Sequence, residues 1–377
     1  MKIAILHEML VKLWGAENVV LSFLEAFPKA DLFTLIYDEN KVGEKFPKNT
    51  INSQVFDLPT QKRYNLFKKQ RLCLGIMAKS VEQIDFSSYD VVLCSSSWFA
   101  HGAITKPDTK FIVYYHSPSR YLWDYTNEYK ESLWINLGFK QIFKYSLNKI
   151  LLKNRMWDFI ASSRPDIPIA ASENVSKRIS KYYKREDYNI IYPPVDINRF
   201  INFKEKTEKK DYYITIAALT EWKRLDILIK SFNIMSDKKL KIVWVWNYEN
   251  EYKKISNSKN IEFLWYKNWD ELTKLLKEAK WFLFASNDDF WIAPVEALAC
   301  STPVFWLWKW WLLETNKKWI TWDFFYNENW EDFIDNFKDF EKNIENDFYK
   351  EENLLSQAKI FSKDKFISEI KGIVENK

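Results

Sequence analysis

Glycine is scarce in this sequence and tryptophan is abundant. The 377 residues include 6 Gly and 19 Trp, whereas globular proteins use about 7% glycine. Turns need residues that adopt positive φ, and glycine does so without steric cost. Six glycines can hardly serve a chain of this length, while glycine and tryptophan together come to about the usual glycine share.

Cysteines are few as well, and the sequence has neither a long apolar run nor a strong charge imbalance. The three cysteines, Cys73, Cys94 and Cys300, are widely separated and have no metal-ligand spacing, which fits a reducing cytoplasm. The opening MKIAILHEML lacks a secretory pattern, and no apolar run approaches the ~20 residues that span a bilayer. A formal net charge of +5 is too mild to indicate nucleic acid, but it suits an anionic substrate or membrane surface. We therefore expect a cytoplasmic protein, soluble or peripheral at the inner face of the membrane.

Many tryptophans stand where glycine is expected, at the points where strands turn into loops or helices. They include Trp244, Trp246, Trp265, Trp291, Trp308, Trp310 and Trp311. We hypothesise that the gene uses a code in which UGA means glycine and was translated with UGA as tryptophan. The alternative is a genuinely tryptophan-rich protein with a carbohydrate-stacking surface. UGG codons at most of these positions would rule out the recoding.

Apolar, β-rich runs alternate with helical patterns along the chain, which predicts βα units and parallel sheets. In the first half we expect strands at residues 2–6, 32–37, 90–96, 110–116 and 167–172, and a helix that begins at the N-capping residue Ser172. In the second half we expect strands at residues 212–219, 241–246, 261–266, 281–286 and 302–307, and helices at 223–234, 270–280 and 294–300.

Two prolines in IIYPPVDINRF (190–200) and the polar stretch that follows are typical of a linker. We place the domain boundary after residue 196, which gives domains 1–196 and 197–377. The last stretch, 361–377, is a candidate amphipathic helix that could pack back on the first domain. Two doubly wound sheets in tandem favour a ligand site in a cleft between them, at the carboxyl ends of the strands.

The segment NDDFWIAPVEALACSTPVFWLWKWWLLET (287–315) carries the most specific motif. With glycine in place of its tryptophans at 291, 308, 310 and 311, it resembles the donor-binding signature of retaining glycosyltransferase family 4, two acids separated by seven residues. These are Asp288 and Glu296. The resemblance implies that Glu296 binds the ribose hydroxyls of the nucleotide and that Asp288, where the family usually has Glu, meets the transferred sugar. A carboxylate suits this role because it accepts two adjacent hydroxyl donors.

Glycine at positions 308, 310 and 311 would form a turn whose backbone N–H groups approach a diphosphate. Three indoles would fill that space. We therefore expect the chain as written to bind donor poorly. The resemblance extends the donor-binding set to Trp291, Leu312, Glu314 and Thr315, and Thr315 can equally be read as a structural helix-start residue.

The segment AALTEWKRLDILIKSF (217–232) resembles the family's phosphate-binding segment. Lys223 falls on the family's lysine and Arg224 follows it, which implies that both balance the leaving diphosphate without metal. Ala218 stands where many members carry a second phosphate-binding arginine. The alternative is a solvated basic pair at a helix start.

The first half carries two weaker motifs. Trp14 and Gly15 follow the opening strand where the family has a glycine-pair loop that approaches donor phosphate and sugar. YYHSPSRYLWDYTNEY (114–129) resembles a subgroup that makes bacterial surface polysaccharides, which implies that His116 faces the reacting sugar or diphosphate and that Arg120 shapes the acceptor side. Trp123 and Trp157 fit aromatic positions of this subgroup, so these two are candidates for genuine tryptophans.

Basic and apolar residues gather in two segments, 61–79 and 139–155. Each could bind the surface of an anionic membrane, which would suit an enzyme with a lipid-linked acceptor. Ordinary helix packing with a solvated face explains them equally well.

The resemblance covers the chain to about residue 326 and implies an α/β protein of the GT-B fold, with two Rossmann-like domains facing a central cleft. The implied reaction is transfer of a sugar from a nucleoside diphosphate to a hydroxyl, with the anomeric configuration kept. No residue pair matches a nucleophile and base, so we favour a same-face mechanism assisted by the leaving phosphate. The subgroup favours GDP-mannose as donor and a growing surface glycan or lipid-linked molecule as acceptor, without metal, cofactor or nucleic acid.

Two other functions stay open. A nucleotide-sugar epimerase shares this architecture, and donor consumption without an acceptor product would favour it. A non-catalytic glycan-binding protein is supported by literal tryptophans and by Ala218. Glycan binding without nucleotide binding would favour that reading.

Overall fold

The structure is a computed structural model, and it forms two compact units. It describes residues 1–13, 15–127, 142–218, 224–245, 249–265, 267–285, 292–307, 322–325, 327, 329–344 and 349–376. The first unit comprises Met1–Pro194 and Phe366–Lys377, and the second comprises Val195–Lys365. The predicted boundary after residue 196 lies beside this division.

The first unit is built on a parallel sheet whose six described strands run in the order β2-β1-β3-β4-β5-β6. The strands are β1 (Ile3–Leu10), β2 (Asp31–Tyr37), β3 (Val91–Ser96), β4 (Lys110–Tyr115), β5 (Ile167–Ala170) and β6 (Asn189–Ile190). Almost every residue of β1, β3 and β4 is buried, because helices cover both faces of a parallel sheet. This explains why these strands read as continuous apolar runs.

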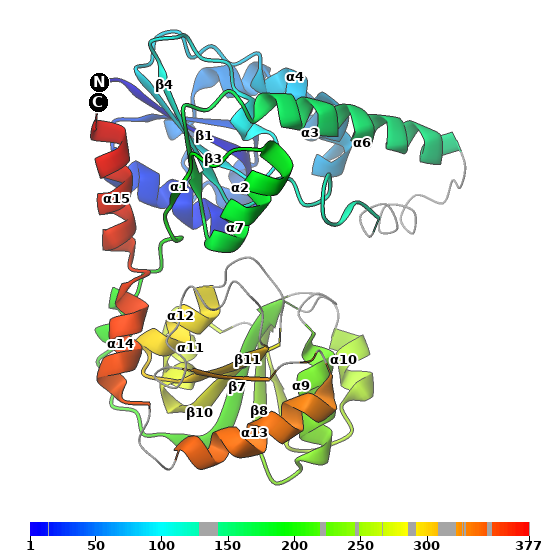
Figure 1. Cartoon of the computed structure of the whole chain (residues 1–377), viewed down its shortest axis with the longest axis vertical. Coiled ribbons are helices and arrows are strands. Elements are labelled where there is room, and N and C mark those ends of the chain that lie inside the picture. Colours follow the sequence, from blue (N-terminus) through cyan, green and yellow to red (C-terminus); the bar gives the residue numbers. More distant parts are fainter. Residues whose placement is uncertain are drawn as a thin grey trace. The chain divides into compact units, whose positions relative to one another are not determined.

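Figure 1 shows α1 and α15 along one side of this sheet and α4 and α6 along the other. The helices of this unit are α1 (Gly15–Ala26), α2 (Glu39–Val42), α3 (Pro59–Phe67), α4 (Met77–Val81), α6 (Ile142–Ala161), α7 (Glu173–Arg178) and α15 (Lys363–Glu375). Short 3₁₀-helical segments lie at η1 (Lys48–Thr50), η2 (Ser53–Asp57), η3 (Gln70–Ile76) and η4 (Ala100–Gly102), and a π-helical turn lies at η5 (Ile179–Tyr183).

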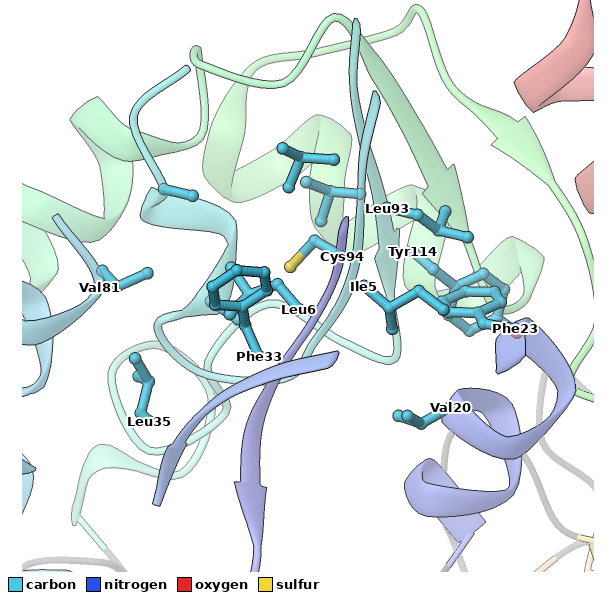
Figure 2. Close-up of a cluster of buried hydrophobic side chains, with 14 of the residues drawn as sticks. Ile5, Leu6, Val20, Phe23, Phe33, Leu35, Val81, Leu93, Cys94 and Tyr114 are labelled. Atoms are coloured by element: carbon cyan, nitrogen blue, oxygen red, sulfur yellow. The ribbon is translucent and has the colours of Figure 1, made fainter. Parts of the chain in front are cut away.

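The last helix completes the core of the first unit. Phe366 of α15 stacks on Phe23 of α1, with ring centroids 5.8 Å apart, and meets Tyr114 of β4 edge-on at 5.6 Å. Figure 2 shows Phe23 and Tyr114 beside Ile5 on one side of the strands and Phe33 on the other. Helix α15, near the end of the sequence, therefore shares one core with α1 and β4. Burying each of these side chains contributes about 1.5–3 kcal/mol to stability.

The second unit repeats this design around another parallel sheet, in the order β12-β11-β10-β7-β8-β9. Its described strands are β7 (Lys210–Ala218), β8 (Leu240–Val245), β9 (Ile261–Leu264), β10 (Ala279–Phe284), β11 (Val304–Leu307) and β12 (Trp322–Phe325). Its described helices are α8 (Asn198–Ile201), α9 (Leu225–Ile234), α10 (Glu249–Ile255), α11 (Trp269–Glu278), α12 (Ile292–Ala299), α13 (Trp330–Ile344) and α14 (Glu351–Lys359). Figure 1 shows α9 and α13 on one side of this sheet and α11 and α12 on the other.

The predicted strands and the α/β fold class are confirmed. The prediction did not include the short strands β6 and β12, and helix boundaries differ in places. Ser172 caps its helix as predicted, since its hydroxyl accepts a hydrogen bond from the Val175 N–H at 3.1 Å. The helix expected at 223–234 begins instead at Leu225, because Arg224 has a φ of 48° and a left-handed residue cannot continue a right-handed helix. In the described part of the chain, no helix is both long and apolar enough to cross a membrane.

Candidate functional site

Polar side chains of the first unit gather where β1, β3 and β4 end. His7 of β1 is paired in register with Ser95 of β3, and the His116 N–H donates to the carbonyl oxygen of Ser96 at 2.9 Å. Because the strands are adjacent and parallel, their carboxyl ends meet at one edge of the sheet. His116 thus lies where the sequence predicted it, at the end of a buried strand.

The hydroxyl of Ser95 joins two histidines. Its oxygen lies 3.1 Å from Nδ1 of His7 and 2.8 Å from Nε2 of His116. Burial, together with the neighbouring His7, lowers the pKa of His116 to about 3. His116 is therefore neutral at physiological pH.

Carboxylates flank His7 on both sides. Oε2 of Glu8 lies 3.9 Å from its Nδ1, and Oε1 of Glu17 lies 4.0 Å from its Nε2. The other oxygen of Glu8 accepts hydrogen bonds from the hydroxyl of Ser96 at 2.9 Å and from the N–H of Ser97 at 2.7 Å. These contacts fix the loop after β3 against the end of β1.

The other site residues predicted in the first unit are Trp14, Gly15 and Arg120, and of these only Gly15 directly follows β1 and its loop in the described structure. Gly15 is the first residue of α1, directly after β1 and its loop, whereas Trp14 lies outside the described residues. The guanidinium of Arg120 lies over the ring of Tyr125, 4.3 Å from its centroid. This stacking orients Arg120 but does not identify an acceptor.

Two tryptophans of the first unit are tied into the structure through their indole N–H groups. Nε1 of Trp123 donates to Oδ2 of Asp158, and Nε1 of Trp157 donates to Oε1 of Glu82, both at 2.8 Å. Trp157 also packs so closely on Gly102 that a Cβ at that glycine would lie 2.2 Å from the ring. Both positions make specific use of an indole.

In the second unit, Glu296 lies in α12, the helix that follows the carboxyl end of β10. Its side chain is buried, and burial raises the pKa of its carboxyl group. An ion pair with Arg199 of α8 opposes this rise, since Nη2 of Arg199 donates to Oε1 of Glu296. Breaking such a pair would leave a buried charge without compensation.

Arg199 is held in place by two aromatic rings. Its guanidinium carbon lies 3.7 Å from the ring centroid of Trp269 of α11 and 4.4 Å from that of Phe200. Stacking of this kind favours Arg over Lys, because the planar guanidinium matches an aromatic face. Arg199 therefore orients the carboxylate of Glu296 as well as balancing its charge.

Arg224 is the other predicted donor-binding residue that the structure describes in this unit. It stands at the N-cap of α9, and its Nε lies 3.1 Å from Oδ1 of Asp226. Ala218 ends β7, the strand that leads toward α9. The other predicted residues lie outside the described ranges: Lys223, Asp288, Trp291, Trp308, Trp310, Trp311, Leu312, Glu314 and Thr315.

Sequence reasoning overlooked several polar residues at these places. His7 and Glu8 lie among the last four residues of β1, and Ser95 is the second-last residue of β3. A polar residue near the carboxyl end of an apolar strand was the signal that could have found them. Arg199 carried no comparable signal, because it is 97 residues from Glu296. Only the packing of α8 against α12 brings the two together.

The first of the two basic and apolar segments forms a defined surface, the α3–η3 surface. Leu66, Phe67 and Leu72 are exposed there by 75%, 47% and 44%. Five cationic residues between positions 62 and 72 are exposed beside them, and that stretch contains no Asp or Glu: Lys62, Arg63, Lys68, Lys69 and Arg71.

The buried face of α3 anchors this surface. Gln61 donates to the carbonyl oxygen of Tyr37 at 2.9 Å and accepts from its N–H at 2.6 Å, while the hydroxyl of Tyr64 donates to Asp38 at 2.7 Å. The exposed residues therefore stand on a fixed base.

The second segment, 139–155, begins outside the described residues. Its described part belongs to α6, where Ile150 and Leu152 are exposed. The apolar exposure continues beyond the predicted segment to Met156, Phe159 and Ile160. Across the described residues, no cluster of three or more His, Cys, Asp or Glu is arranged to hold a metal ion.

Comparison with known protein families finds two domains in series. Residues 14–199 match the domain described as "Glycosyltransferase Family 4", and residues 196–357 match "Glycosyl transferases group 1". Among curated proteins, the O-antigen chain mannosyltransferase RfbU of Salmonella typhimurium is 27% identical over 145 residues. That match covers 36% of this chain and 40% of the relative.

Solved structures of similar fold cover the whole chain. HepE from Anabaena, in complex with UDP-glucose, has a TM-score of 0.69 and 14% identity, with 100% of each chain covered. Sucrose-phosphate synthase from Thermosynechococcus elongatus has a TM-score of 0.70 and 10% identity, covering 100% of this chain and 98% of its own. A glycosyltransferase from Rickettsia africae has a TM-score of 0.63 and 15% identity, with full coverage of both chains. At these identities the likeness establishes the shared fold.

Proposed function

Because this chain belongs to the GT-B glycosyltransferases, with a family 4 domain followed by a group 1 domain, we propose that it transfers a sugar from a nucleoside diphosphate to a hydroxyl acceptor with retention of configuration. The observation that carries this proposal is the pair of domain matches in series. Glu296, a buried carboxylate oriented by Arg199 beyond the carboxyl end of β10, supports it.

The proposed roles follow from the chemistry of each side chain. Glu296 accepts hydrogen bonds from the two ribose hydroxyls, for which an ionised carboxylate is suited. Asp288 meets the transferred sugar. Lys223 and Arg224 balance the charge that develops on the leaving diphosphate, and His116 faces the sugar or diphosphate from the first unit.

The proposed reaction needs no metal and no covalent enzyme intermediate. The bond between the anomeric carbon and the diphosphate oxygen breaks, and the acceptor oxygen forms its bond to that carbon on the same face. The acceptor proton passes to the departing phosphate oxygen. Basic side chains and backbone N–H groups accelerate such a step by stabilising the charge on the leaving group more strongly in the transition state than in the ground state.

GDP-mannose is the proposed donor, and a growing surface glycan or lipid-linked molecule is the proposed acceptor. The weak likeness to an O-antigen chain mannosyltransferase supports this choice. The fold relative from Anabaena was solved with UDP-glucose, so UDP-glucose is the main competing donor.

The recoding of UGA as glycine is part of the proposal. The native enzyme has glycine at positions 14, 291, 308, 310 and 311, and backbone N–H groups there approach the diphosphate. Trp123 and Trp157 remain tryptophan in the native chain, since each indole N–H has a carboxylate partner.

The test of this function is a donor panel that includes GDP-mannose and UDP-glucose, with lipid-linked glycans as acceptors. We expect mannose transfer, release of GDP, and an α-linked product whose configuration is read by NMR. Transfer from UDP-glucose alone would replace the donor. Donor consumption without a glycosylated product would favour an epimerase, and inversion of configuration would refute the retaining mechanism.

We further propose that the α3–η3 surface meets an anionic membrane, which would bring the enzyme to a lipid-linked acceptor. Exposed apolar side chains enter the headgroup region, and each Lys or Arg near an anionic surface contributes about 1 kcal/mol. With five cations and no acid between positions 62 and 72, charge and apolar exposure coincide.

Vesicle sedimentation checks this prediction. We expect the protein to pellet with vesicles containing phosphatidylglycerol, less so at high salt because salt screens the attraction, and not with phosphatidylcholine alone. L66S/F67S and K68Q/K69Q/R71Q should each reduce binding at least about tenfold. I234S and I360S, which remove exposed apolar residues of the second unit, are the matched controls. Equal binding by all four variants, or no lipid-dependent binding, would refute the membrane surface.

A further inference from the structure

The contacts of Ser95 with His7 and His116 determine where the proton of His116 lies. Nδ1 of His7 is 3.3 Å from the carbonyl oxygen of Ser95 and 3.1 Å from its hydroxyl oxygen. A carbonyl oxygen can only accept a hydrogen bond, so Nδ1 of His7 carries a proton. The Ser95 hydroxyl accepts from the same N–H.

The Ser95 hydroxyl then has its single proton left to donate. A hydroxyl oxygen can accept two hydrogen bonds, but among the described residues the only acceptor within reach of the Ser95 proton is Nε2 of His116, at 2.8 Å. We therefore assign Nε2 as the acceptor of that proton. The neutral imidazole carries only one proton of its own, and with Nε2 acting as acceptor this proton lies on Nδ1.

We propose that Ser95 and His7 are positioning residues that hold His116 as the neutral Nδ1–H tautomer, so that His116 serves its site as a hydrogen-bond donor through Nδ1 and not as a base or a cation. Among the described residues, no hydrogen bond occupies Nδ1 of His116. The donor direction follows from the alignment of three adjacent strand ends.

The inference takes the identity of the ligand, a nucleotide sugar, from the proposed function. A sugar hydroxyl and a diphosphate oxygen share the property that matters, an oxygen that accepts a hydrogen bond from a neutral N–H. A donor with a fixed tautomer needs no reorganisation when the ligand arrives, which makes its hydrogen bond more effective.

His101 is a second buried histidine, and both of its ring nitrogens face acceptors. Its Nε2 lies 3.4 Å from the carbonyl oxygen of Asp158, and its Nδ1 lies 3.3 Å from the hydroxyl oxygen of Ser96, whose proton goes to Glu8. Burial lowers the pKa of His101 to about 4, so this ring is neutral. Its contacts therefore do not select one tautomer, in contrast to those of His116.

The tautomers can be read from nitrogen chemical shifts in the full chain labelled with ¹⁵N-histidine. The sequence contains three histidines, so single substitutions assign each signal. We expect a protonated Nδ1 for His116. In S95A the His116 ring should lose this preference, and in S95T, which keeps the hydroxyl, it should retain it. A protonated Nε2 at His116 in the unaltered protein would overturn the proposal.

Donor binding tests the consequence, using the protein with glycine at positions 14, 291, 308, 310 and 311. Asparagine places its amide N–H near the position of Nδ1, whereas glutamine places it near Nε2. We expect H116N to bind GDP-mannose about tenfold more tightly than H116Q, and S95A to lose about tenfold where S95T does not, the effect of one hydrogen bond.

The two measurements separate the failures. If the nitrogen shifts agree but no variant binds a nucleotide sugar, the proposed function is wrong and the tautomer assignment stands. The glycine-containing protein with His116 in place could instead bind donor while H116Q binds it as tightly as H116N or more tightly. The inference about His116 is then wrong and the function stands.

Discussion

With glycine at positions 14, 291, 308, 310 and 311, the protein should turn over its nucleotide sugar at least about 100-fold faster than the tryptophan-containing chain. The reason is steric. A diphosphate reaches backbone N–H groups only where no side chain intervenes, and losing a single preorganised donor already costs about 10²–10³ in kcat. Release of nucleoside diphosphate, measured with both proteins under the same conditions, checks this result.

The same substitution at other tryptophans provides the control. In W123G and W157G we expect a lower midpoint of thermal unfolding and no gain in turnover, because these indoles donate to buried or half-buried carboxylates. Large-to-small changes in a packed core cost about 3–5 kcal/mol. Equal turnover by the glycine and tryptophan proteins would contradict the recoding. So would tryptophan at these five positions in the native protein, as read by mass spectrometry.

E296Q should lower the donor kcat/KM about 100-fold. A neutral amide replaces the acceptor of two hydroxyl donors, and hydrogen bonds to a charged group contribute about 1.5–3 kcal/mol each. Steady-state kinetics with GDP-mannose, in the glycine-containing protein, measure the loss. Unchanged donor kinetics in E296Q would remove Glu296 from the donor site.

Removing Arg199 should act through the protonation of Glu296. Burial raises the pKa of Glu296 and Arg199 opposes that rise, so in R199Q the pKa rises further. Less of the carboxyl group is then ionised at a given acidic pH, and the acid limb of the donor-binding profile should move to higher pH.

K210Q is the matched control for R199Q. Nζ of Lys210 lies 2.7 Å from Oε2 of Glu278, another buried carboxylate of the second unit. We expect K210Q to leave the pH profile of donor binding in place, even where it lowers stability. The same shift in both variants would mean that R199Q acts through stability alone.

The alternation of apolar runs and helical patterns was sufficient to predict the α/β class and the positions of the main strands. Burial on both faces makes each strand apolar throughout, so β1, β3 and β4 could be recognised locally. Helix ends were predicted less well. The helix predicted from residue 223 begins only after Arg224, whose backbone is left-handed, and the side chain of Arg224 gives no sign of this conformation.

For the candidate site, the resemblance of residues 287–315 to family 4 implied Glu296, and the resemblance of residues 114–129 to a subgroup implied His116 at the end of a buried strand. Neither prediction included the partner that sets the chemistry of the residue. The carboxylate of Glu296 pairs with Arg199, and the ring of His116 bonds to Ser95.

Composition and periodicity therefore establish the shortage of glycine and the two α/β domains, and a local motif that resembles family 4 supplies the candidate acids, because each is a property of neighbouring residues. The tertiary structure decides which strands are adjacent and which helices pack together. His7 meets Ser95 across 88 residues because β1 lies next to β3, and Arg199 meets Glu296 across 97. Contacts over such separations depend on the order of strands and helices in space, which no local pattern encodes.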